Sequence, residues 1–302
     1  MKNVKEFYKK IFPYLGVKGV LNWIPDEIYL KINFRIQTNK KLNLENPITF
    51  NEKLQWLKLN DRNPIYTKLV DKYEVRKYIT QSIGEEYLIP CLGIYNEFDE
   101  INFDLLPPKF VLKCTHDSGS VILCKDKKTF DTEKANRILT KKLKQNHYNG
   151  GREWPYKHIT PRIICEEYIV DEYENDLKDY KIFCFNGKPK LIQVDYNRFT
   201  NHKRNLYTTN WEFIDASIQY PNDRNVNIEK PKSLEKMLNL ATILSQSYPH
   251  VRVDFYNINE KIYFGELTFY HESGFAKYEP KELENLMGSW ITLEKDARGN
   301  KK

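Results

Sequence analysis

The first third of the chain has apolar residues at helical spacing. This periodicity predicts short helices over DEIYLKINFRI and TFNEKLQWLKLND, and Thr49 and Glu52 form a capping box at the start of the second helix. A further helical pattern covers YTKLVDKYEVRKYITQSIG and ends at Gly84. We therefore expect residues 1–60 to form a helical N-terminal extension.

From Leu88 onwards, short runs of apolar residues predict strands. The first three runs are EYLIPCLGIY, PKFVLKCT and VILCKD, and a polar HDSGS turn precedes the third. A basic helix follows between Lys125 and His147, opened by Asp131 or Thr129. The next apolar run, RIICEEYIV, predicts another strand.

Two β-hairpins are predicted in the second half of the chain. DYKIFCFNGKPKLIQVDYN turns at Asn186-Gly187, a residue pair that two-residue hairpin turns favour. VRVDFYNINEKIYFGELTF turns near Asn259 to Glu260, and the amphipathic helix SLEKMLNLATILSQSY precedes it. Strands and helices alternate without regular strand–helix–strand units, which predicts an α+β fold with antiparallel sheets.

The second hairpin concentrates polar side chains on one face. Arg252, Asp254, Glu266 and Thr268 all occupy positions of the same parity, and the turn places Asp254 opposite Glu266 or one position off it. Two carboxylates so close repel each other, and a divalent cation such as Mg²⁺ is one way to compensate for them. A solvated face with weakly paired charges explains the pattern equally well.

A possible phosphate-binding turn follows the strand that ends near Lys113. The segment THDSGS is small and polar, and its backbone N–H groups can point at phosphates. It is not a P-loop, because the GxxxxGK[ST] pattern is missing and a strand follows the turn. Hairpins with a nearby lysine are common, so this pattern alone does not decide the function.

Two further segments have a functional and a simpler interpretation. The acids Glu166 and Glu167 end a buried strand, where backbone groups can hold an adenine, or they are simply solvated. Arg198, His202 and Arg204 lie in a predicted loop that either closes over anionic groups or forms an exposed turn.

Composition narrows the class of protein. An apolar content of 40% excludes wholesale disorder, and a net charge of +7 suits anionic partners such as nucleotides, acidic sugars or a membrane surface. We expect no nucleic acid partner. The five cysteines show no CxxC pairing or zinc spacing, which indicates reduced cysteines in a cytoplasmic protein.

The N-terminal stretch MKNVKEFYKKIFPYLGVKGVLNWIP is basic and aromatic. It lacks the apolar run of about 18 residues that a membrane span needs, and it lacks a signal-peptide pattern. Such a helix either packs on its own domain or makes peripheral contact with the inner face of a membrane.

Seven segments, in this order, resemble the TupA-like branch of the ATP-grasp superfamily, named for teichuronopeptide biosynthesis. They are TFNEKLQWLK, LVDKYEVRKYI, FVLKCTHDSGS, EWPYKHITPRIICEEYI, DYKIFCFNGKPKLIQVD, VRVDFYN and GELTFYHESGF. The resemblance implies an ATP-grasp domain over 61–302, in which two α+β subdomains clasp ATP. The phosphate-loop subdomain would cover about 85–165, and the hinge, metal and substrate subdomain about 166–302.

The resemblance also implies roles for individual residues. Lys72 and Lys113 would bind the ATP phosphates, and Arg252 would act with them in catalysis. Asp254, Glu266 and Thr268 would bind Mg²⁺, although Thr268 stands where the family commonly has Asn. The remaining nucleotide-binding positions would be His116, Ser118, Gly119, Ser120, Glu166, Glu167, Tyr168, Ile169, Asp179 and Lys181, and the substrate positions Arg198, His202 and Arg204.

The implied activity is an ATP-dependent carboxylate–amine ligase of bacterial surface polysaccharide biosynthesis. A uronic acid or amino acid carboxylate, from an acidic sugar or polysaccharide precursor, would be activated as an acyl phosphate. An amine or amino acid would then form an amide. Two alternatives remain open, a glycosyltransferase of the same biosynthesis and an ATP-grasp phosphotransferase.

Overall fold

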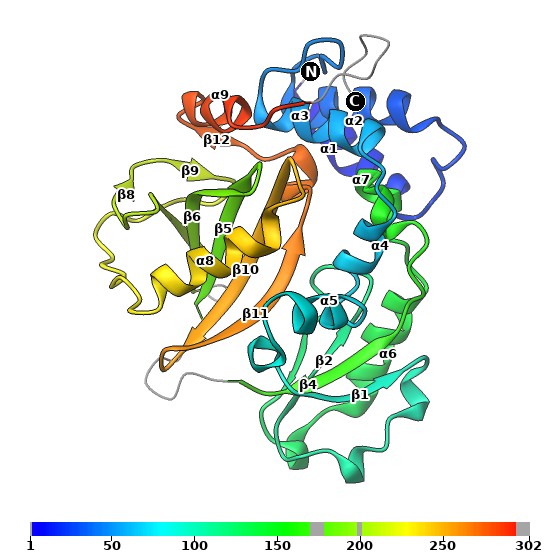
Figure 1. Ribbon diagram of the computed structural model, residues 1–302. Helices are drawn as coiled ribbons and strands as arrows, with labels where there is room; N and C mark the ends of the chain where they lie inside the picture. The colour runs from blue at the N-terminus through cyan, green and yellow to red at the C-terminus, as the bar shows by residue number, and fades with distance from the viewer. Residues whose placement is uncertain (1, 170–177, 198–200, 294–302) are drawn as a thin grey trace. The chain divides into compact units, whose positions relative to one another are not determined.

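The protein is described from a computed structural model, which describes residues 2–169, 178–197 and 201–293. The chain divides into two compact units, which we describe separately (Figure 1). The first unit comprises Met1–Pro25, Asn63–Gln81 and Leu88–Ile169, and the second comprises Asp26–Arg62, Ser82–Tyr87 and Val170–Lys302. Both units combine helices with sheets, and all strand pairs in the described residues are antiparallel. The predicted α+β class is confirmed.

The first unit is built around a four-stranded sheet with the order β1-β4-β2-β3. Strands β2 and β4 are central, so each pairs with a neighbouring strand along both of its edges. The elements are α1 (Lys2–Val17), α4 (Ile65–Val70), α5 (Val75–Ser82), β1 (Cys91–Tyr95), η2 (Phe98–Glu100), η3 (Phe103–Leu105), β2 (Phe110–Cys114), β3 (Ile122–Cys124), η4 (Lys127–Thr129), α6 (Thr132–Leu143), α7 (Tyr148–Gly151), η5 (Trp154–Tyr156) and β4 (Ile163–Glu167).

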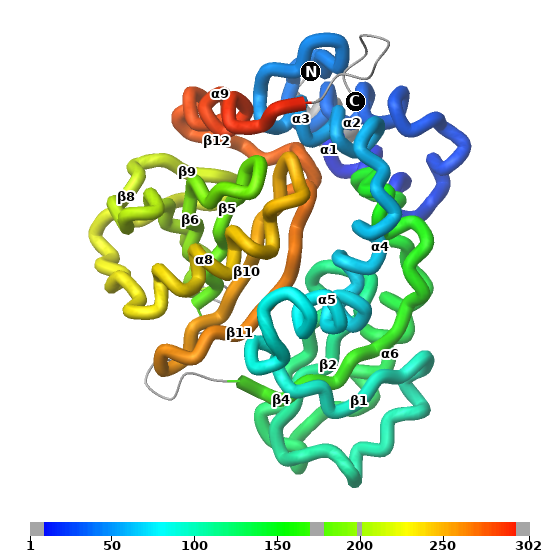
Figure 2. The backbone as a smooth tube through the Cα atoms, viewed as in Figure 1, coloured from blue at the N-terminus to red at the C-terminus, as the bar shows by residue number. Residues whose placement is uncertain are grey.

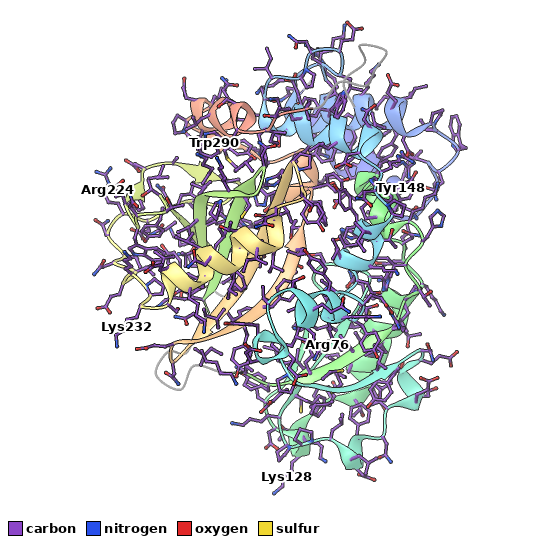
Figure 3. The ribbon with its side chains drawn as sticks, viewed as in Figure 1. Arg76, Lys128, Tyr148, Arg224, Lys232 and Trp290 are labelled. Carbon is purple, nitrogen blue, oxygen red and sulfur yellow. The ribbon has the colours of Figure 1, made fainter. Side chains whose placement is uncertain are left out.

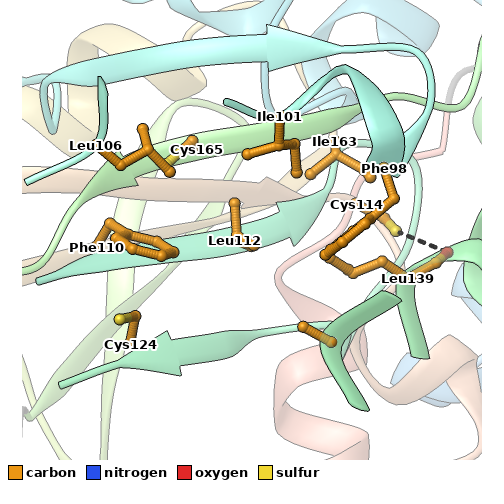
Figure 4. Close-up of a cluster of buried hydrophobic side chains, with 11 residues drawn as sticks. Phe98, Ile101, Leu106, Phe110, Leu112, Cys114, Cys124, Leu139, Ile163 and Cys165 are labelled. Carbon is orange, nitrogen blue, oxygen red and sulfur yellow. Dashed lines mark hydrogen bonds between the residues drawn. The ribbon is translucent and has the colours of Figure 1, made fainter. Parts of the chain in front are cut away.

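One face of this sheet carries the apolar core of the first unit (Figure 4). Alternate residues of β2, namely Phe110, Leu112 and Cys114, point into it, and Ile163 and Cys165 do the same from β4. Because side chains alternate along a strand, the intervening residues of β2 and β4 face the other way. That other face holds charged side chains.

The predicted helix ending at Gly84 is in fact two helices, α4 and α5, which Figure 2 shows as separate turns. The break lies at Asp71, whose Oδ1 accepts the backbone N–H groups of Tyr73 (2.8 Å) and Glu74 (2.9 Å). A carboxylate that binds nearby N–H groups replaces the helical pattern with a turn and starts a new helix. The prediction of one continuous helix was therefore wrong.

The basic helix is shorter than Lys125 to His147. It forms α6, and Asp131 is its N-cap, with Oδ1 accepting the N–H of Lys134 at 2.9 Å. Of the two caps considered, Asp131 is confirmed, and Thr129 instead ends the short helix η4.

The second unit contains a six-stranded sheet with the order β11-β10-β5-β6-β7-β8. Helix α8 packs on β5, β6 and β10. The elements are α2 (Asp26–Thr38), α3 (Phe50–Asn60), η1 (Glu85–Tyr87), β5 (Asp179–Phe185), β6 (Lys188–Tyr196), β7 (Lys203–Tyr207), β8 (Phe213–Ile214), β9 (Ser217–Ile218), α8 (Leu234–Ser245), β10 (His250–Ile258), β11 (Lys261–Thr268), η6 (His271–Gly274), β12 (Tyr278–Glu279) and α9 (Glu282–Ser289).

Both predicted hairpin turns are confirmed. Asn186 and Gly187 have φ values of +46° and +77°, and Asn259 and Glu260 have +49° and +66°. Two successive residues with positive φ are typical of the turns that match the twist of paired strands. The second turn sets the register where β10 and β11 begin to pair, with Ile258 opposite Lys261.

Three other sequence-based expectations can be checked directly. The capping box at Thr49 is present, because its Oγ1 accepts the Glu52 N–H (3.3 Å) and the Glu52 carboxylate accepts the Thr49 N–H (3.0 Å). All five cysteines lie in the described part of the chain and are free. No helix among the described residues is both long and apolar enough to cross a membrane.

Gly288 generates a prediction about stability, because α9 packs against the start of α3 at this residue. A Cβ at Gly288 would lie 2.3 Å from the Ile48 carbonyl oxygen and 2.9 Å from the Phe50 nitrogen. Backbone atoms cannot move aside as a flexible side chain can, so Gly288→Ala should lower the free energy of unfolding by about 1–3 kcal/mol. Chemical denaturation would measure the loss. Leu286→Ala, at a half-exposed position of the same helix, is the control and should change stability little. Equal stability of the Gly288 variant and the wild type would contradict the packing.

Candidate functional site

The hairpin of the second unit places its acids on one face, as predicted. In the pairing of β10 with β11, Arg252 lies opposite Thr268 and Asp254 lies opposite Glu266. Paired residues on adjacent strands point to the same side of the sheet. One cation, two carboxylates and one hydroxyl therefore meet on this face.

A β-bulge follows the paired acids. Asp254 pairs with Glu266, but Phe255 pairs with Phe264, so Gly265 is the extra residue of β11. A Cβ at Gly265 would lie 3.1 Å from the Asp254 carbonyl oxygen, so glycine lets the two strands stay close. Bulges commonly adjust the direction of side chains beside functional sites.

Arg252 is the centre of the polar face. Its Nε and Nη2 donate to Asp254 Oδ1 and Oδ2, both at 2.7 Å, in a bidentate ion pair. Nη2 also lies 3.1 Å from Glu266 Oε1 and 3.1 Å from Thr268 Oγ1, and Nη1 lies 2.7 Å from His271 Nδ1. These contacts hold the guanidinium from two strands and from η6. Arg252 is 7% exposed, so its orientation is fixed in a largely buried position.

Lys181 adds a second cation to the same face. It lies opposite Asp254 on β5, and its Nζ is 2.8 Å from Asp254 Oδ2 and 3.2 Å from Asp179 Oδ2. Burial alone lowers the pKa of Lys181, but Asp179 and Asp254 outweigh it and raise the pKa above its ordinary value. Burial likewise opposes the charge of Arg252, and Asp254 and Glu266 raise its pKa. Both cations therefore stay charged at neutral pH.

His271 belongs to this group of residues, and the sequence did not reveal it. Burial lowers its pKa well below the usual range, and Arg252 lowers it further, so the ring is neutral. Because a guanidinium can only donate, Nδ1 accepts from Arg252 and the ring hydrogen is on Nε2. Nε2 has no hydrogen-bond partner among the described residues. A lone histidine with no ligand spacing gives no sequence signal, and only the fold brings it to Arg252.

The donor atoms on this face suit a hard cation. Asp254, Glu266 and Thr268 offer two carboxylates and a hydroxyl, and Mg²⁺ usually takes one or two protein carboxylates together with phosphate oxygens. The Glu266 side chain is 40% exposed, so its carboxylate is open to an incoming ion. The described residues contain no group of three or more His, Cys, Asp or Glu side chains arranged for a metal. Two protein carboxylates match the number that Mg²⁺ takes when phosphate oxygens supply other ligands.

In the first unit, Lys113 lies on the polar face of β2. Its Nζ is 2.7 Å from Glu166 Oε2, and Arg76 Nη1 (labelled in Figure 3) lies 3.6 Å from Glu166 Oε1. Lys113 and Glu166 occupy neighbouring positions on β2 and β4, opposite to the face of the apolar core. The carboxylate thus neutralises a lysine that the sequence assigned to phosphate binding.

Lys72 lies beside the polar turn that follows β2. Its backbone N–H donates to the Thr115 carbonyl at 3.0 Å, and its Nζ donates to the Asp117 carbonyl. The structure therefore brings Lys72 to the predicted phosphate-binding turn, although they are more than 40 residues apart in the chain.

The turn itself is partly buried and internally bonded. Ser120 Oγ accepts the Cys114 N–H (2.9 Å) and donates to Asp117 Oδ1 (2.5 Å). His116 is buried, with its Nε2 3.2 and 3.1 Å from two carbonyl oxygens at the end of α6, and burial lowers its pKa. This places His116 in the support of the turn. Ser118 and Gly119 are exposed, and a Cβ at Gly119 would meet nothing within 4 Å.

The predicted adenine-binding residues lie at the end of β4. Glu166 is inside the strand and pairs with Cys91 on one side and Val111 on the other. Glu167 donates its N–H to the Pro90 carbonyl at 3.0 Å. Tyr168 and Ile169 follow the strand, and Asp179 begins β5 in the second unit, where it is 2% exposed.

The predicted basic loop is corrected by the structure. Arg204 lies in strand β7 and is 4% exposed, so the prediction that it lies in a loop was wrong. Its guanidinium binds Asp195 on β6 (2.7 and 3.3 Å) and Glu272 (3.1 Å), which allows a charged residue to be buried in the sheet. His202 lies 3.5 Å from the same Asp195 carboxylate. Arg198 lies outside the described residues.

Asp195 is ionised in this arrangement. Burial raises its pKa, but Arg204 and Lys181 outweigh burial and bring the pKa below its ordinary value. The second unit thus joins Asp179, Lys181, Arg252, Asp254, Glu266 and Thr268 with Asp195 and Arg204 on one sheet. The first unit joins Lys72, Lys113 and the polar turn.

Comparison with solved structures gives distant similarities to ATP-grasp enzymes. The D-alanine–D-alanine ligase of Bacillus anthracis in complex with ATP is 17% identical, with a TM-score of 0.38, over 67% of this chain and 54% of the ligase. An ADP complex of N5-carboxyaminoimidazole ribonucleotide synthetase is 15% identical, with a TM-score of 0.41, over 72% of this chain and 50% of that one. This chain thus spans about half the length of these enzymes. Curated proteins include no match to the sequence.

The sequence matches a family model directly. Residues 52–292 match the model described as TupA-like ATPgrasp. The match includes Lys72, Lys113, Arg252, Asp254 and Glu266, together with His271. Most of the chain is covered, and this protein belongs to the TupA-like ATP-grasp family.

Proposed function

We propose that this protein is an ATP-dependent ligase that joins a carboxylate to an amine. The observation that carries the proposal is how the hydrogen bonds of the Arg252 guanidinium are distributed. The guanidinium has five N–H groups. Those on Nε and Nη2 bind Asp254, Glu266 and Thr268, and one on Nη1 binds His271. The second N–H on Nη1 has no partner among the described residues, and we assign it to an oxygen of the substrate.

Lys72 and Lys113 are assigned to the ATP phosphates. In the structure their ammonium groups bind protein oxygens, namely the Asp117 carbonyl and the Glu166 carboxylate. Phosphate oxygens are strong acceptors for charged donors, so the nucleotide can replace these partners. The lysines would then neutralise the charge that spreads over the phosphates during transfer.

Asp254 and Glu266, with Thr268 as a further oxygen donor, would hold Mg²⁺. The bound ion would shield the charge of the ATP phosphates. Burial raises the pKa of Asp254, and Arg252 and Lys181, which pair with its carboxylate, oppose this rise. Arg252, held by this carboxylate and by His271, needs no reorientation when negative charge develops on a substrate oxygen.

The proposed reaction has two steps. An oxygen of the substrate carboxylate attacks the γ-phosphorus of ATP, the bond to the β,γ-bridging oxygen breaks, and ADP leaves an acyl phosphate. The amine then attacks the acyl carbon, the oxyanion forms near Arg252, and inorganic phosphate leaves as the amide forms and the amine loses a proton. Stabilisation of charge is the main demand on the protein, which agrees with a site rich in Lys, Arg and carboxylates.

We infer that the carboxylate belongs to a uronic acid or amino acid in a precursor of a bacterial surface polysaccharide, capsular or cell-wall, and that the amine is an amino acid. Membership of the TupA-like family supports this substrate class, and a chain with net charge +7 suits an acidic sugar. His202 and Arg204 would influence binding through Asp195 rather than as exposed contacts.

The substrate class leads to a direct test. ADP release from ATP should require a uronic acid and an amino acid together, and mass spectrometry should detect the amide. Reactions that lack either the uronic acid or the amino acid are the controls. If ADP forms and the product is a phosphorylated sugar, the reaction is phosphotransfer rather than ligation. If the rate of ADP release depends on neither the uronic acid nor the amino acid, the proposed substrates are wrong.

The assignment of Lys113 predicts a loss of activity. Lys113→Met should lower kcat for ADP formation by about 100-fold, because one charged group that stabilises the transferred phosphoryl group is gone. Steady-state kinetics at saturating ATP would measure kcat. Lys109→Met, at an exposed position just before β2, is the matched control and should retain full activity. Similar activity of the two variants would remove Lys113 from the mechanism.

The contact between His271 and Arg252 predicts that His271 is a positioning residue. His271→Phe removes the acceptor for Nη1 and should lower kcat by about 10-fold, with little change in KM for ATP, because Arg252 loses its orientation. His271→Gln keeps an acceptor and should recover part of kcat. The control is His250→Phe, since His250 is also buried but bonds the Cys184 carbonyl. An equal loss of kcat in both phenylalanine variants would point to general disruption instead.

A further inference from the structure

The segment that follows the start of α1 exposes large apolar side chains. Tyr14, Val17, Val20 and Trp23 are 60, 42, 56 and 80% exposed. Tyr14 and Val17 lie in the last turns of α1, and Val20 and Trp23 lie in the turns that follow the helix end, where Gly19 has a φ of +76°. Single exposed apolar residues are ordinary, but four exposed ones within ten residues, one of them a tryptophan, need an explanation. We call these four side chains the patch.

The patch is attached firmly to the first unit. Helix α1 packs against α7, and Arg152, which ends α7, is 1% exposed. The Arg152 guanidinium donates to Asn22 Oδ1 and to the Leu21 carbonyl, both at 2.8 Å, and lies 5.0 Å from the centre of the ring of Tyr148, which is labelled in Figure 3. The backbone just before Trp23 is therefore held by hydrogen bonds to a buried arginine. The exposed side chains therefore belong to a folded part of the protein.

The surroundings of the patch are positively charged. Residues 1–25 contain five lysines and a single acid, Glu6. Lys10 and Lys18 are exposed, and the Lys18 ammonium lies 5.7 Å from the centre of the Tyr14 ring. Aromatic and apolar side chains beside lysines are the combination that binds at the interface of anionic membranes.

We propose that residues 10–23 form a docking surface for an anionic lipid bilayer, which the first unit places against the membrane interface. Trp23 and Tyr14 would enter the headgroup region, where aromatic rings with a polar atom are favoured. Lys10 and Lys18 would bind lipid phosphates. This is contact with the surface, which agrees with the lack of a spanning helix among the described residues. It goes beyond the proposed ligase activity and does not depend on it.

The charge argues against a second copy of the chain as the partner. Two such patches face to face would bring lysines near lysines, and like charges oppose contact. An anionic surface instead gains from each lysine. Interfacial docking also needs only a small apolar area, whereas stable association of two proteins generally buries about 800 Å² on each partner.

The test is sedimentation of the full chain with vesicles. Wild-type protein should pellet with vesicles of phosphatidylglycerol and phosphatidylcholine, pellet less as salt is raised, and stay in solution with pure phosphatidylcholine. Trp23→Ala should weaken binding at least about 10-fold, because a large apolar side chain is lost. Lys18→Glu should weaken binding by more than the roughly fivefold expected for one lysine.

Leu105→Ala is the matched control, because Leu105 is an apolar residue that is 82% exposed in the same unit but lies outside residues 10–23. It should bind vesicles as the wild type does. Thermal unfolding of each variant would show that it folds. Loss of binding in Leu105→Ala equal to that in Trp23→Ala would overturn the proposal, as would binding to neutral vesicles as strong as to anionic ones. Light scattering that showed a dimer dissociated by Trp23→Ala would assign the patch to a second copy.

Discussion

The second unit depends on one interaction, the bidentate ion pair between Arg252 and Asp254, two positions apart on strand β10. Burying two charges costs free energy that their mutual attraction offsets only with excellent geometry and further hydrogen bonds. The neighbouring elements supply these bonds, since Lys181 comes from β5, Glu266 from β11 and His271 from η6. The pair thus requires charged or polar partners on the strands on both sides of β10. A change at any one of these contacts leaves a buried charge with fewer partners.

Each unit separates its apolar core from its charged residues by the alternation of side chains along strands. In the first unit, Leu112 and Cys165 enter the core (Figure 4), while Lys113 and Glu166 occupy positions that face the other side. A sheet can therefore carry buried charges without disrupting its packing, because the cost is confined to one face. The charged side chains of this face hold one another in place, so they would already be positioned when a ligand reached the proposed site. Such preorganisation is the main source of electrostatic catalysis in enzymes.

The sequence was sufficient where local rules decide the structure. Both hairpin turns were predicted from their turn residues alone. The pairing of Asp254 with Glu266 needed more, because the turn pairs Ile258 with Lys261 and only the β-bulge at Gly265 brings Glu266 opposite Asp254. Arg204 was assigned to a loop because basic residues cluster around it. Its partner Asp195 lies on a different strand, and only the pairing of β6 with β7 shows that the charge can be buried. His271 was missed for the same reason, since its role comes from a contact 19 residues back along the chain.

The short segment η6 connects stability with the proposed chemistry. Glu272 and Ser273 have φ values of +46° and +52°, which are unfavourable for residues with a side chain. Surrounding contacts must hold such a conformation. Lys58 donates to the Ser273 carbonyl at 2.8 Å and Gln55 donates to it at 3.0 Å, both from buried positions on α3. In return, this segment presents one side chain to each arginine of the charged face, and a relaxed backbone would turn both away. The helix α3, which looks from its sequence like part of a simple extension, therefore helps to orient the arginine on which the proposed ligase reaction depends.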